Sequence, residues 1–538
     1  MWAFMATVAD HIVRRLREAG VGCLFGVPGG GSNLNLIEAA GRAGLPFVLT
    51  ATETAGAIAA LAQAEVTGRP GACLTTLGPG AASAVNGVAC AFLDRAPVVV
   101  FTDSLPAAAR AFEHQRLDQR ALFAPITKQS RSLDPDRADE MVELALELAA
   151  AGRPGPVHLD CPGDVASAVV APERPLRIVR APGGPGAPGE RDLAALDPLL
   201  SRARRPLVLV GLGARRDEDA AAIRALCGAR GVPAMVTYKA KGVVPDGHPW
   251  FAGVFTNASV ERPLIDESDL LIGIGLDPVE LIPRPWTVEA PIVYCGPYDV
   301  DDGHMPFAAR LVTDVPAAVA HLSERLARSS WDAARVREDV ARQRAAIGVS
   351  APGLTAQRVV EIAAGQLAPA FRVAVDAGAH MFPATVLWPA DDPNGFLISN
   401  GLSTMGFALP AAIGAALAER RRRVAVLTGD GGLLMSAAEL LTAARERLPI
   451  LVIVFNDASL SLIEIKQQQR RYPPSGVALG EVDWAALAGS VGVPAWRADD
   501  ETGLAKAIAK ARDVEGPALV DARIDRSNYG ATLRAVRG

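Results

Sequence analysis

The sequence predicts an α/β protein built from three doubly wound domains, each with a parallel sheet. Short apolar runs alternate with alanine-rich helical stretches along the whole chain, and this alternation is typical of parallel sheets covered by helices on both faces. At 538 residues, the chain is long enough for about three domains of roughly 150 to 200 residues each. The expected strands include residues 97–102, 206–211, 270–275, 372–376 and 424–428.

Two shifts in composition divide the chain into these domains. Residues 171–191 are too rich in proline and glycine to keep a helical or strand periodicity, so we expect an exposed linker there. Residues 331–353 contain a charged helix and then an Ala-Pro-Gly breaker, after which a new helical pattern starts. The predicted domains are therefore residues 1–170, 192–330 and 354–538, and the two outer ones look broadly similar.

The composition points to small-molecule partners. The net charge is −5, from 54 basic and 59 acidic residues, and no basic run is longer than residues 420–423, so neither nucleic acid nor a membrane surface is expected as a partner. Residues 1–20 are typical of an amphipathic helix rather than a signal peptide, and no apolar stretch is typical of a membrane-spanning helix. We therefore expect a cytoplasmic enzyme. The six scattered cysteines lack metal-ligand spacing and are expected in the core.

The N-terminal domain carries two glycine-rich turns and one acidic strand end. A turn at Pro28 and Gly29 follows a short apolar run, and a second turn at Gly78 opens a helix. Glycine in such turns lets the backbone approach a ligand closely. Glu53 follows the expected strand 47–51 and leads into another helix. On this pattern alone, Glu53 is either a helix-start acid stabilised by the helix dipole or a catalytic carboxyl group.

The middle domain contains Gly211 and Gly213 directly after a strand. A dinucleotide-binding turn also needs a third glycine and an acidic residue at the end of the following strand, and neither is found at the expected place. We therefore expect a tight turn between strand and helix at this point.

The C-terminal domain has two acidic strand ends. Asp430 and Asp457 each follow an apolar strand, with one helix between them that is expected to open after Gly432. Gly429, Gly431 and Gly432 let the backbone pass close to a ligand, and the helix start favours an anion. A divalent metal that joins both carboxylates to a diphosphate fits these features, because Mg2+ prefers oxygen ligands and shares them with phosphates. The alternative is a turn whose acid only caps the helix.

Several motifs occur in the order seen in thiamine-diphosphate enzymes, and the chain resembles their acetolactate synthase-like branch over nearly its whole length. The motifs are Phe25-Gly-x-Pro-Gly-Gly, Glu53, Gly78-Pro-Gly, Gly401-Leu-Ser-Thr-Met-Gly, and Gly429-Asp-Gly with Asn456-Asp457. The resemblance implies a pyrimidine-binding domain, a middle domain and a diphosphate-binding domain. It also implies that two subunits form each active site, so a homodimer or homotetramer is expected.

The resemblance implies which residues hold thiamine diphosphate and Mg2+. Asp430, Asp457 and the Ser459 carbonyl are the expected metal ligands, although family members usually have asparagine in place of Asp457. Met405 resembles the apolar wedge that bends the cofactor, and His380 resembles a diphosphate contact; without the resemblance, Met405 fits a core role and His380 a capping or packing role. The expected cofactor-binding residues are Pro28, Gly29, Glu53, Gly78, Gly378, His380, Met405, Gly429, Asp430, Gly431, Gly432, Asp457, Ser459 and Leu462.

The reaction that the resemblance implies is decarboxylation of a 2-oxo acid with carboligation, in which an enamine intermediate forms a carbon–carbon bond with a carbonyl acceptor. Glu53 is expected to activate the cofactor, and His114 and Gln115 occupy further catalytic positions. A 2-oxo acid decarboxylase that does not ligate would share every cofactor motif. A cofactor-binding relative without enzymatic activity is the alternative from another class.

The expected substrate positions depart from those of true acetolactate synthases. His114 replaces a phenylalanine, Leu462 stands where methionine is frequent, and Lys466 stands where tryptophan is found. A lysine and a histidine at a pocket mouth could bind an anionic substrate group or relay a proton. The alternative for Lys466 is a solvated position on a helix face.

Some synthases of this branch also carry FAD on the middle domain. Residues 275–281 of this chain lack the arginine and the phenylalanine of the usual flavin-side pattern. We therefore expect no FAD.

Overall fold

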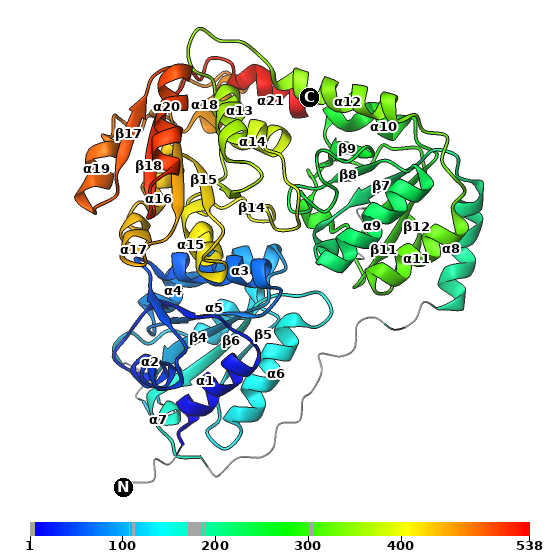
Figure 1. The fold of residues 1–538 in the computed structure, drawn as a ribbon. Coiled ribbons are helices and arrows are strands. Elements are labelled where there is room, and N and C mark those ends of the chain that lie inside the picture. The colour runs from blue at the N-terminus through cyan, green and yellow to red at the C-terminus, as the bar shows by residue number, and fades with distance from the viewer. Residues whose placement is uncertain are drawn as a thin grey trace. The chain divides into compact units, whose positions relative to one another are not determined.

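The computed structural model describes residues 6–106, 108, 109, 113–170, 186, 189–300, 303 and 305–537, and it contains three six-stranded parallel sheets flanked by helices (Figure 1). The predicted α/β class is therefore confirmed. Of the linker expected at residues 171–191, only 186 and 189–191 lie within the described residues. The chain groups into two compact units: unit 1 is Met1–Gly183, Leu409–Arg421 and Ser436–Leu448, and unit 2 is Gly184–Ala408, Arg422–Met435 and Pro449–Gly538.

The sheet of unit 1 is built from the N-terminal third of the chain. Its elements are α1 (Val8–Glu18), β1 (Leu24–Val27), α2 (Ser32–Ala43), β2 (Phe47–Leu49), α3 (Glu53–Thr67), β3 (Gly71–Thr75), α4 (Pro79–Leu93), β4 (Val98–Ser104), α5 (Gln119–Phe123), β5 (Gln129–Ser132), α6 (Ala138–Ala150), β6 (Val157–Pro162) and α7 (Gly163–Ala166). The strand order is β2-β1-β3-β4-β6-β5. Helices α1, α2 and α6 share one apolar cluster with the sheet, whereas α3 packs against β1, β3 and α4.

Two helices from much later in the chain complete unit 1, namely α15 (Ala408–Ala418) and α17 (Glu439–Arg445). A Cβ atom at Gly414 would lie 2.1 Å from the Ala59 carbonyl oxygen, so α15 approaches α3 at a distance that only glycine allows. The Arg445 guanidinium donates a hydrogen bond to the Leu49 carbonyl at the end of β2. These contacts tie the region around the start of α3 to the C-terminal third of the chain.

The middle sheet, in unit 2, has the order β9-β8-β7-β10-β11-β12. Its elements are α8 (Glu190–Arg202), β7 (Pro206–Val210), α9 (Asp217–Arg230), β8 (Ala234–Val236), β9 (Phe251–Val254), α10 (Arg262–Asp266), β10 (Leu270–Ile274), β11 (Ile292–Gly296), β12 (Phe307–Val312), α11 (Val315–Arg325) and α12 (Ala333–Ile347). Helices α8, α9 and α11 pack on the face that contains Val208, and α10 and α12 pack on the face that contains Leu207 (Figure 1). The strand order reverses between β7 and β10, where open α/β sheets commonly have a ligand crevice.

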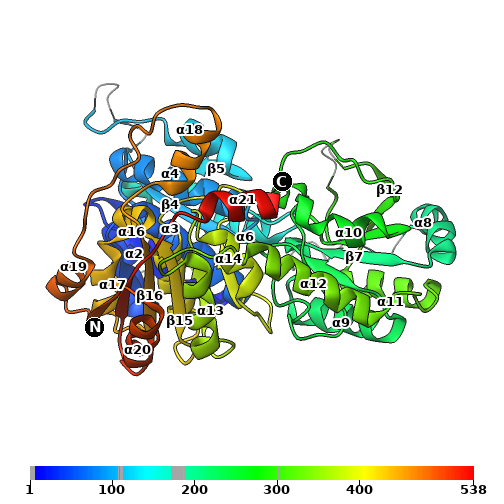
Figure 2. The same ribbon diagram turned by 90° about the horizontal axis from the view of Figure 1, so that it is seen from above.

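The third sheet, also in unit 2, has the order β14-β13-β15-β16-β18-β17. Its elements are α13 (Ala356–Leu367), β13 (Arg372–Val375), α14 (Met381–Leu387), β14 (Phe396–Ile398), β15 (Val424–Gly429), α16 (Asp430–Ser436), β16 (Ile450–Asn456), α18 (Ser461–Gln469), α19 (Trp484–Ser490), β17 (Ala495–Ala498), α20 (Glu501–Arg512), β18 (Ala518–Arg523) and α21 (Tyr529–Arg537). Counted in chain order, this is the strand order of the first sheet, which confirms the predicted likeness of the outer domains. Helix α21 packs against α12 (Figure 2).

Some element boundaries differ from the prediction. Helix α16 begins at Asp430, not after Gly432, because the Asp430 carboxylate accepts a hydrogen bond from the Gly431 amide within the first turn (2.7 Å). Strand β2 ends at Leu49, because the Thr50 hydroxyl turns to bond the Thr52 carbonyl (2.8 Å). The expected turn after β7 is a 3-10 helix, Leu212–Ala214.

All six cysteines are buried, which confirms their expected place in the core. Burial raises the pKa of five of them, Cys23, Cys73, Cys161, Cys227 and Cys295, to about 12. Within the described ranges, no helix is long and apolar enough to cross a membrane.

Candidate functional site

Asp430 and Asp457 lie together at the carboxyl edge of the third sheet. They follow the paired strands β15 and β16, in which Gly429 is opposite Phe455. One oxygen of the Asp430 carboxylate accepts hydrogen bonds from the amides of Ala458 (2.6 Å) and Asp457 (3.2 Å). The buried Asp430 side chain therefore holds the loop after β16 against the start of α16.

The two carboxyl groups lie close enough for the charge of Asp457 to act on Asp430. Burial, followed by the nearby Asp457 charge, raises the pKa of Asp430 to about 6, and burial also raises the pKa of Asp457. Asp457 accepts hydrogen bonds from the Ser459 amide (3.1 Å) and the Ser461 hydroxyl (2.5 Å). A bound cation would favour the ionised form of both carboxyl groups.

The described residues contain no group of three or more His, Cys, Asp or Glu side chains placed to hold a metal ion. A cation at Asp430 and Asp457 would therefore need backbone carbonyl oxygens or ligand oxygens to complete its coordination. Such a donor set fits a hard cation like Mg2+, which usually keeps water or phosphate ligands.

His380 supplies a buried polar atom next to these turns. Its ring stacks on Phe455, with 4.9 Å between the ring centroids, and atoms of the ring lie 2.7 and 3.4 Å from the Cβ positions that side chains at Gly378 and Gly429 would have. Burial lowers the pKa of His380 to about 4, so the ring is neutral at neutral pH. Its Nε2 atom is buried and has no hydrogen-bond partner among the described residues. Because buried polar atoms are rarely left unbonded, a ligand oxygen here would fit the donor that Nε2 can offer.

Asp376 holds this edge of the sheet together, and the sequence interpretation did not single it out. Its buried carboxylate accepts hydrogen bonds from the amides of Gly406 and Phe407 (both 3.0 Å) and from the Thr428 hydroxyl (2.9 Å). A Cβ atom at Gly432 would lie 2.2 Å from Asp376 Oδ2, so position 432 has no room for a side chain unless Asp376 moves. The signal that could have found Asp376 is the same as for Asp430, an acidic residue directly after a buried strand.

Met405 lies beside the glycines of α16. A Cβ atom at Gly431 would lie 3.4 Å from the Met405 methyl group and 2.7 Å from the Leu460 side chain. Met405 is only partly buried, whereas the adjoining Gly406 and Phe407 are buried and anchored by Asp376. Gly429, Asp430, Gly431, Met405 and His380 are thus brought together.

The loop after β16 and helix α18 carry the other site residues expected in this domain. The Ser459 hydroxyl donates to Glu464 (3.0 Å), which also pairs with Arg526 (2.6 Å). On α18, Leu462 packs partly buried against the apolar core, and Lys466 is exposed.

In unit 1, Glu53 is the first residue of α3. Thr52 caps this helix, because its hydroxyl accepts a hydrogen bond from the Ala55 amide (3.1 Å). Thr76 lies between the neighbouring glycine turns: Cβ atoms at Gly29 and Gly80 would lie 2.1 and 2.6 Å from its side chain. The same Cβ position at Gly80 is 3.0 Å from Glu53 Oε1. The half-buried Glu53 carboxylate thus stands beside the start of α4.

Gly78 and Gln115 are also neighbours in unit 1. Gly78 has φ +60°, its amide donates to the buried Gln119 side chain (2.7 Å), and its Cβ position lies 2.6 Å from the Gln115 carbonyl oxygen. Pro28, which precedes Gly29, and His114, which precedes Gln115, are exposed. Gln119, which further bonds Asp160 (2.8 Å), was not singled out from the sequence, since its partners lie on distant strands.

At the crevice of the middle sheet, a side chain of the protein itself bonds the turn after β7. Glu280 is buried, and its carboxyl oxygens accept hydrogen bonds from the Leu212 amide (2.8 Å) and the Thr237 hydroxyl (2.6 Å). Burial raises the pKa of Glu280 to about 8, against the lowering effect of those two bonds. An acidic side chain of the chain itself therefore uses the backbone amide that a nucleotide phosphate would need at this turn.

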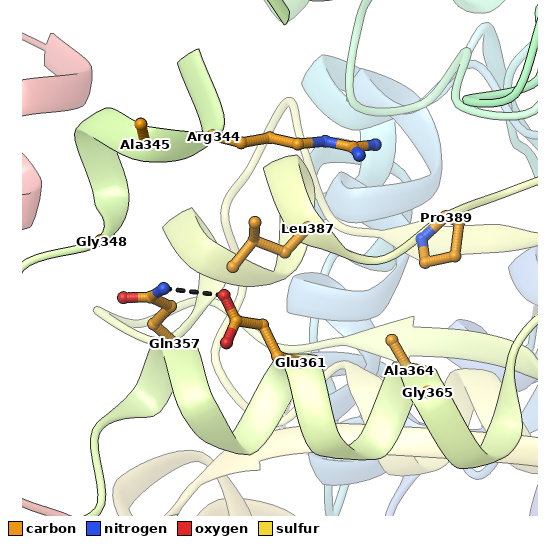
Figure 3. Close-up of a pocket in the computed structure, with 9 residues that line it drawn as sticks. All are labelled: Arg344, Ala345, Gly348, Gln357, Glu361, Ala364, Gly365, Leu387 and Pro389. Atoms are coloured by element: carbon orange, nitrogen blue, oxygen red, sulfur yellow. Dashed lines mark hydrogen bonds between the residues drawn. The ribbon is translucent and has the colours of Figure 1, made fainter. Parts of the chain in front are cut away.

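A separate pocket of about 530 Å3 lies between α12, α13 and the chain after α14 (Figure 3). Arg344 and Glu361 line it, and the Gln357 amide donates to Glu361 Oε1 (2.7 Å). None of the site residues expected from the sequence lines this pocket.

Comparisons with known families agree with the motifs. Residues 6–122 match the N-terminal binding domain of thiamine pyrophosphate enzymes, residues 193–322 match the central domain, and residues 376–522 match the C-terminal binding domain; thiamine pyrophosphate is another name for thiamine diphosphate.

Similar curated proteins match over nearly the full length of both chains. An acetolactate synthase of Bacillus subtilis is 30% identical over 97% of this chain and 93% of its own, and the large subunit of acetolactate synthase isozyme 1 of Escherichia coli is 29% identical over 96% and 94%. A probable 2-ketoarginine decarboxylase of Pseudomonas aeruginosa is 30% identical over 96% and 94%.

Proposed function

The chain belongs to the thiamine pyrophosphate enzymes, in their acetolactate synthase-like branch, and from this premise we propose that it decarboxylates a 2-oxo acid and joins the remaining fragment to a carbonyl acceptor. The observation that carries the proposal is the cluster at the third sheet, where the buried Asp430, the partly buried Asp457, glycine turns and a histidine nitrogen without a hydrogen-bond partner among the described residues meet. Glycine at these turns lets the backbone approach a diphosphate closely, and the carboxyl groups suit the metal that binds it.

In the proposed site, Asp430, Asp457 and the Ser459 carbonyl hold Mg2+. His380 Nε2 and the backbone at Gly378, Gly429, Gly431 and Gly432 contact the diphosphate. The support is that burial and the neighbouring Asp457 charge raise the pKa of Asp430, an effect that a bound cation would offset, and that His380 Nε2 has no hydrogen-bond partner among the described residues.

The thiazolium ring of the bound cofactor would supply the electron sink for decarboxylation. Met405 and Leu462 would support the cofactor on its apolar side, and Glu53, contributed by another subunit, would hold a proton at the aminopyrimidine ring. Pro28, Gly29, Gly78 and Gln115 would line that half of the site. The position of Glu53 at a helix start beside Gly80 supports this role.

The acceptor step is the part of the proposal that has a specific alternative. The similar decarboxylase of P. aeruginosa shows that the branch includes proteins named for decarboxylation alone. His114 and Lys466 are exposed polar residues in positions where the branch often has aromatic ones, and we assign them to recognition of an anionic group on the donor or the acceptor.

We also propose that the enzyme works as a cytoplasmic homodimer or homotetramer on small molecules, without nucleic-acid or membrane partners. Two large apolar side chains are exposed on α16, the helix that begins at Asp430: Leu434 (43%) and Met435 (61%). Apolar side chains exposed next to a binding site are typical of a surface that a second subunit covers. The domain boundaries 1–170, 192–330 and 354–538 stay a prediction, and the matched family ranges lie within them.

The absence of FAD is a further part of the proposal. Glu280 supports it, because its carboxyl group already takes the Leu212 amide at the turn where a dinucleotide phosphate would bind. The purified protein should show no flavin absorbance near 450 nm, and addition of FAD should leave turnover unchanged.

Product analysis tests the proposed function. The protein, supplied with thiamine diphosphate and Mg2+, is screened with 2-oxo acids for CO2 release, alone and with aldehyde or ketone acceptors. Ligation predicts an acceptor-dependent hydroxyketone product, whereas an aldehyde as the sole product would replace the proposal by the decarboxylase alternative. Absence of cofactor binding in calorimetry would overturn both.

A further inference from the structure

Glu439 is a buried acid that none of the expected site residues explains. It is the first residue of α17, and only 1% of it is exposed. Its Oε1 atom accepts hydrogen bonds from the amides of Ala51 (2.9 Å) and Thr52 (3.2 Å), which lie 388 and 387 positions earlier in the chain. One carboxylate oxygen thus holds two successive backbone amides.

These two amides directly precede Glu53. Thr52 is also held by its carbonyl, which accepts the Thr50 hydroxyl (2.8 Å), and by its side chain, which caps α3. The Thr50 amide in turn donates to the Gly26 carbonyl (3.1 Å) on β1. Hydrogen bonds from β1, from the start of α3 and from Glu439 therefore fix the backbone that precedes Glu53. Of these, the bonds to Glu439 come from the C-terminal third of the chain.

The placement of Glu439 has an energetic cost that a purely packing role would not require. Burial raises its pKa, while the hydrogen bonds from the two amides lower it, and the buried Oε2 atom has no hydrogen-bond partner among the described residues. Bonds to a charged acceptor are stronger than neutral ones, so they offset the burial of the carboxylate. An apolar residue at this position would leave the amides of Ala51 and Thr52 without this acceptor.

We propose that Glu439 is a positioning residue that sets the place of the Glu53 carboxylate through the backbone of Ala51 and Thr52. The inference rests on the proposed role of Glu53 in cofactor activation. Both bonds end on one oxygen atom, so this role depends on how far that oxygen extends from the backbone of α17, which we call its reach. Two substitutions separate reach from charge.

Glu439→Gln keeps an acceptor oxygen at the same reach and removes the charge. Glu439→Asp keeps the charge and withdraws the oxygen by about 1.5 Å, the length of one carbon–carbon bond. Glu38→Gln is the control, because Glu38 is an exposed acid on α2 that pairs with Arg42 instead of the β2–α3 loop. If the aspartate variant does not fold, Glu439→Ala takes its place, because it removes the acceptor while water can still reach the exposed Ala51 and Thr52.

The first measurement is amide hydrogen exchange of the cofactor-free protein in the peptide that covers residues 47–58. We expect Glu439→Asp to raise exchange at Ala51 and Thr52 at least tenfold, and Glu439→Gln and the control to stay within threefold of wild type. Unchanged exchange in Glu439→Asp would overturn the inference, whatever the enzyme's activity.

The second measurement is turnover of the holoenzyme. We expect Glu439→Asp to lower kcat at least tenfold, with KM and the affinity for thiamine diphosphate within threefold, and Glu439→Gln to restore kcat to within threefold of wild type. Equal losses in both variants would mean that keeping the reach of the acceptor oxygen is not sufficient, which contradicts the inference. A failed proposed function would show differently: wild type would lack turnover, while the exchange result of the cofactor-free protein would stand by itself.

Discussion

The outer sheets and the middle sheet use the same kind of edge in opposite ways. In each sheet, glycine-rich turns follow parallel strands, which is the usual place of a ligand site in α/β folds. In the middle sheet, Glu280 lies in the crevice and accepts a hydrogen bond from the Leu212 amide. In the third sheet, His380 Nε2 stays unbonded among the described residues. Whether such an edge can bind a ligand therefore depends on how many of its polar groups the chain's own side chains already satisfy.

If this comparison is right, variants at the outer edges should alter cofactor chemistry or binding, whereas a variant at the middle edge should alter stability alone.

The largest effect is expected at the first sheet. Glu53→Gln should lower kcat by roughly 100- to 10,000-fold, the range for loss of a general acid–base group, because the amide cannot hold the proton at the aminopyrimidine ring. Its affinity for thiamine diphosphate should change little. Steady-state turnover and calorimetry measure the two quantities, and Glu38→Gln, a substitution on the exposed side of α2, is the control. Intact turnover in Glu53→Gln would remove Glu53 from the mechanism.

At the third sheet, Asp430→Asn should weaken the Mg2+-dependent binding of thiamine diphosphate by roughly 100-fold, because a charged oxygen ligand is replaced by a neutral one. Calorimetric titration with the cofactor at several Mg2+ concentrations measures this. Asp521→Asn is the control, since Asp521 is a buried acid of the same sheet whose partner is Asn456 (2.8 Å). Equal losses in the two variants would indicate a fold defect instead of a metal site.

His380→Phe keeps a ring that can stack on Phe455 but removes both nitrogens. We expect the affinity for thiamine diphosphate to fall about tenfold, as for the loss of one hydrogen bond to a charged group, while the melting temperature changes little. Calorimetry and thermal unfolding of the cofactor-free protein test this. Unchanged affinity would assign His380 to packing.

The smallest effect on function is expected at the middle sheet. In the folded protein the pKa of Glu280 is raised to about 8 from an ordinary value of 4.5, so its contribution to stability is present at acidic pH and is lost as pH rises through 8. The free energy of unfolding of wild type should therefore decrease between about pH 4.5 and 8, by at most about 1.4 kcal/mol per pH unit from this group, and level off above pH 8. Glu280→Gln should flatten that dependence and leave kcat unchanged. Denaturant unfolding at several pH values is the measurement, and a steep loss of turnover in the variant would contradict a purely structural middle edge.

The sequence predicted the three sheets and the pair Asp430 and Asp457, because strand ends are local signals. The apolar runs marked β15 and β16, and the acids that follow them could be placed on one edge without knowing any distant contact. Asp376 carried the same signal after β13 but lacked a recognisable motif. Its role in bonding Gly406 and Phe407 became visible only in three dimensions.

Residues whose partners lie far along the chain could not be predicted. Glu439 bonds amides at positions 51 and 52, and Glu280 bonds Leu212 and Thr237, so nothing near either residue in the sequence marks its task. The start of α16 was misplaced for a related reason: glycine usually disfavours helix, but the Asp430 side chain stabilises the first turn.

The buried cysteines make the protein suited to following its own unfolding. Four of them, Cys23, Cys73, Cys90 and Cys161, lie in the N-terminal third, two, Cys227 and Cys295, lie in the middle sheet region, and the C-terminal third has none. A thiol reagent can reach them only when the surrounding structure opens, because all six are buried. The order in which peptides acquire label would therefore time the opening of the first sheet against that of the middle sheet, without any engineered probe.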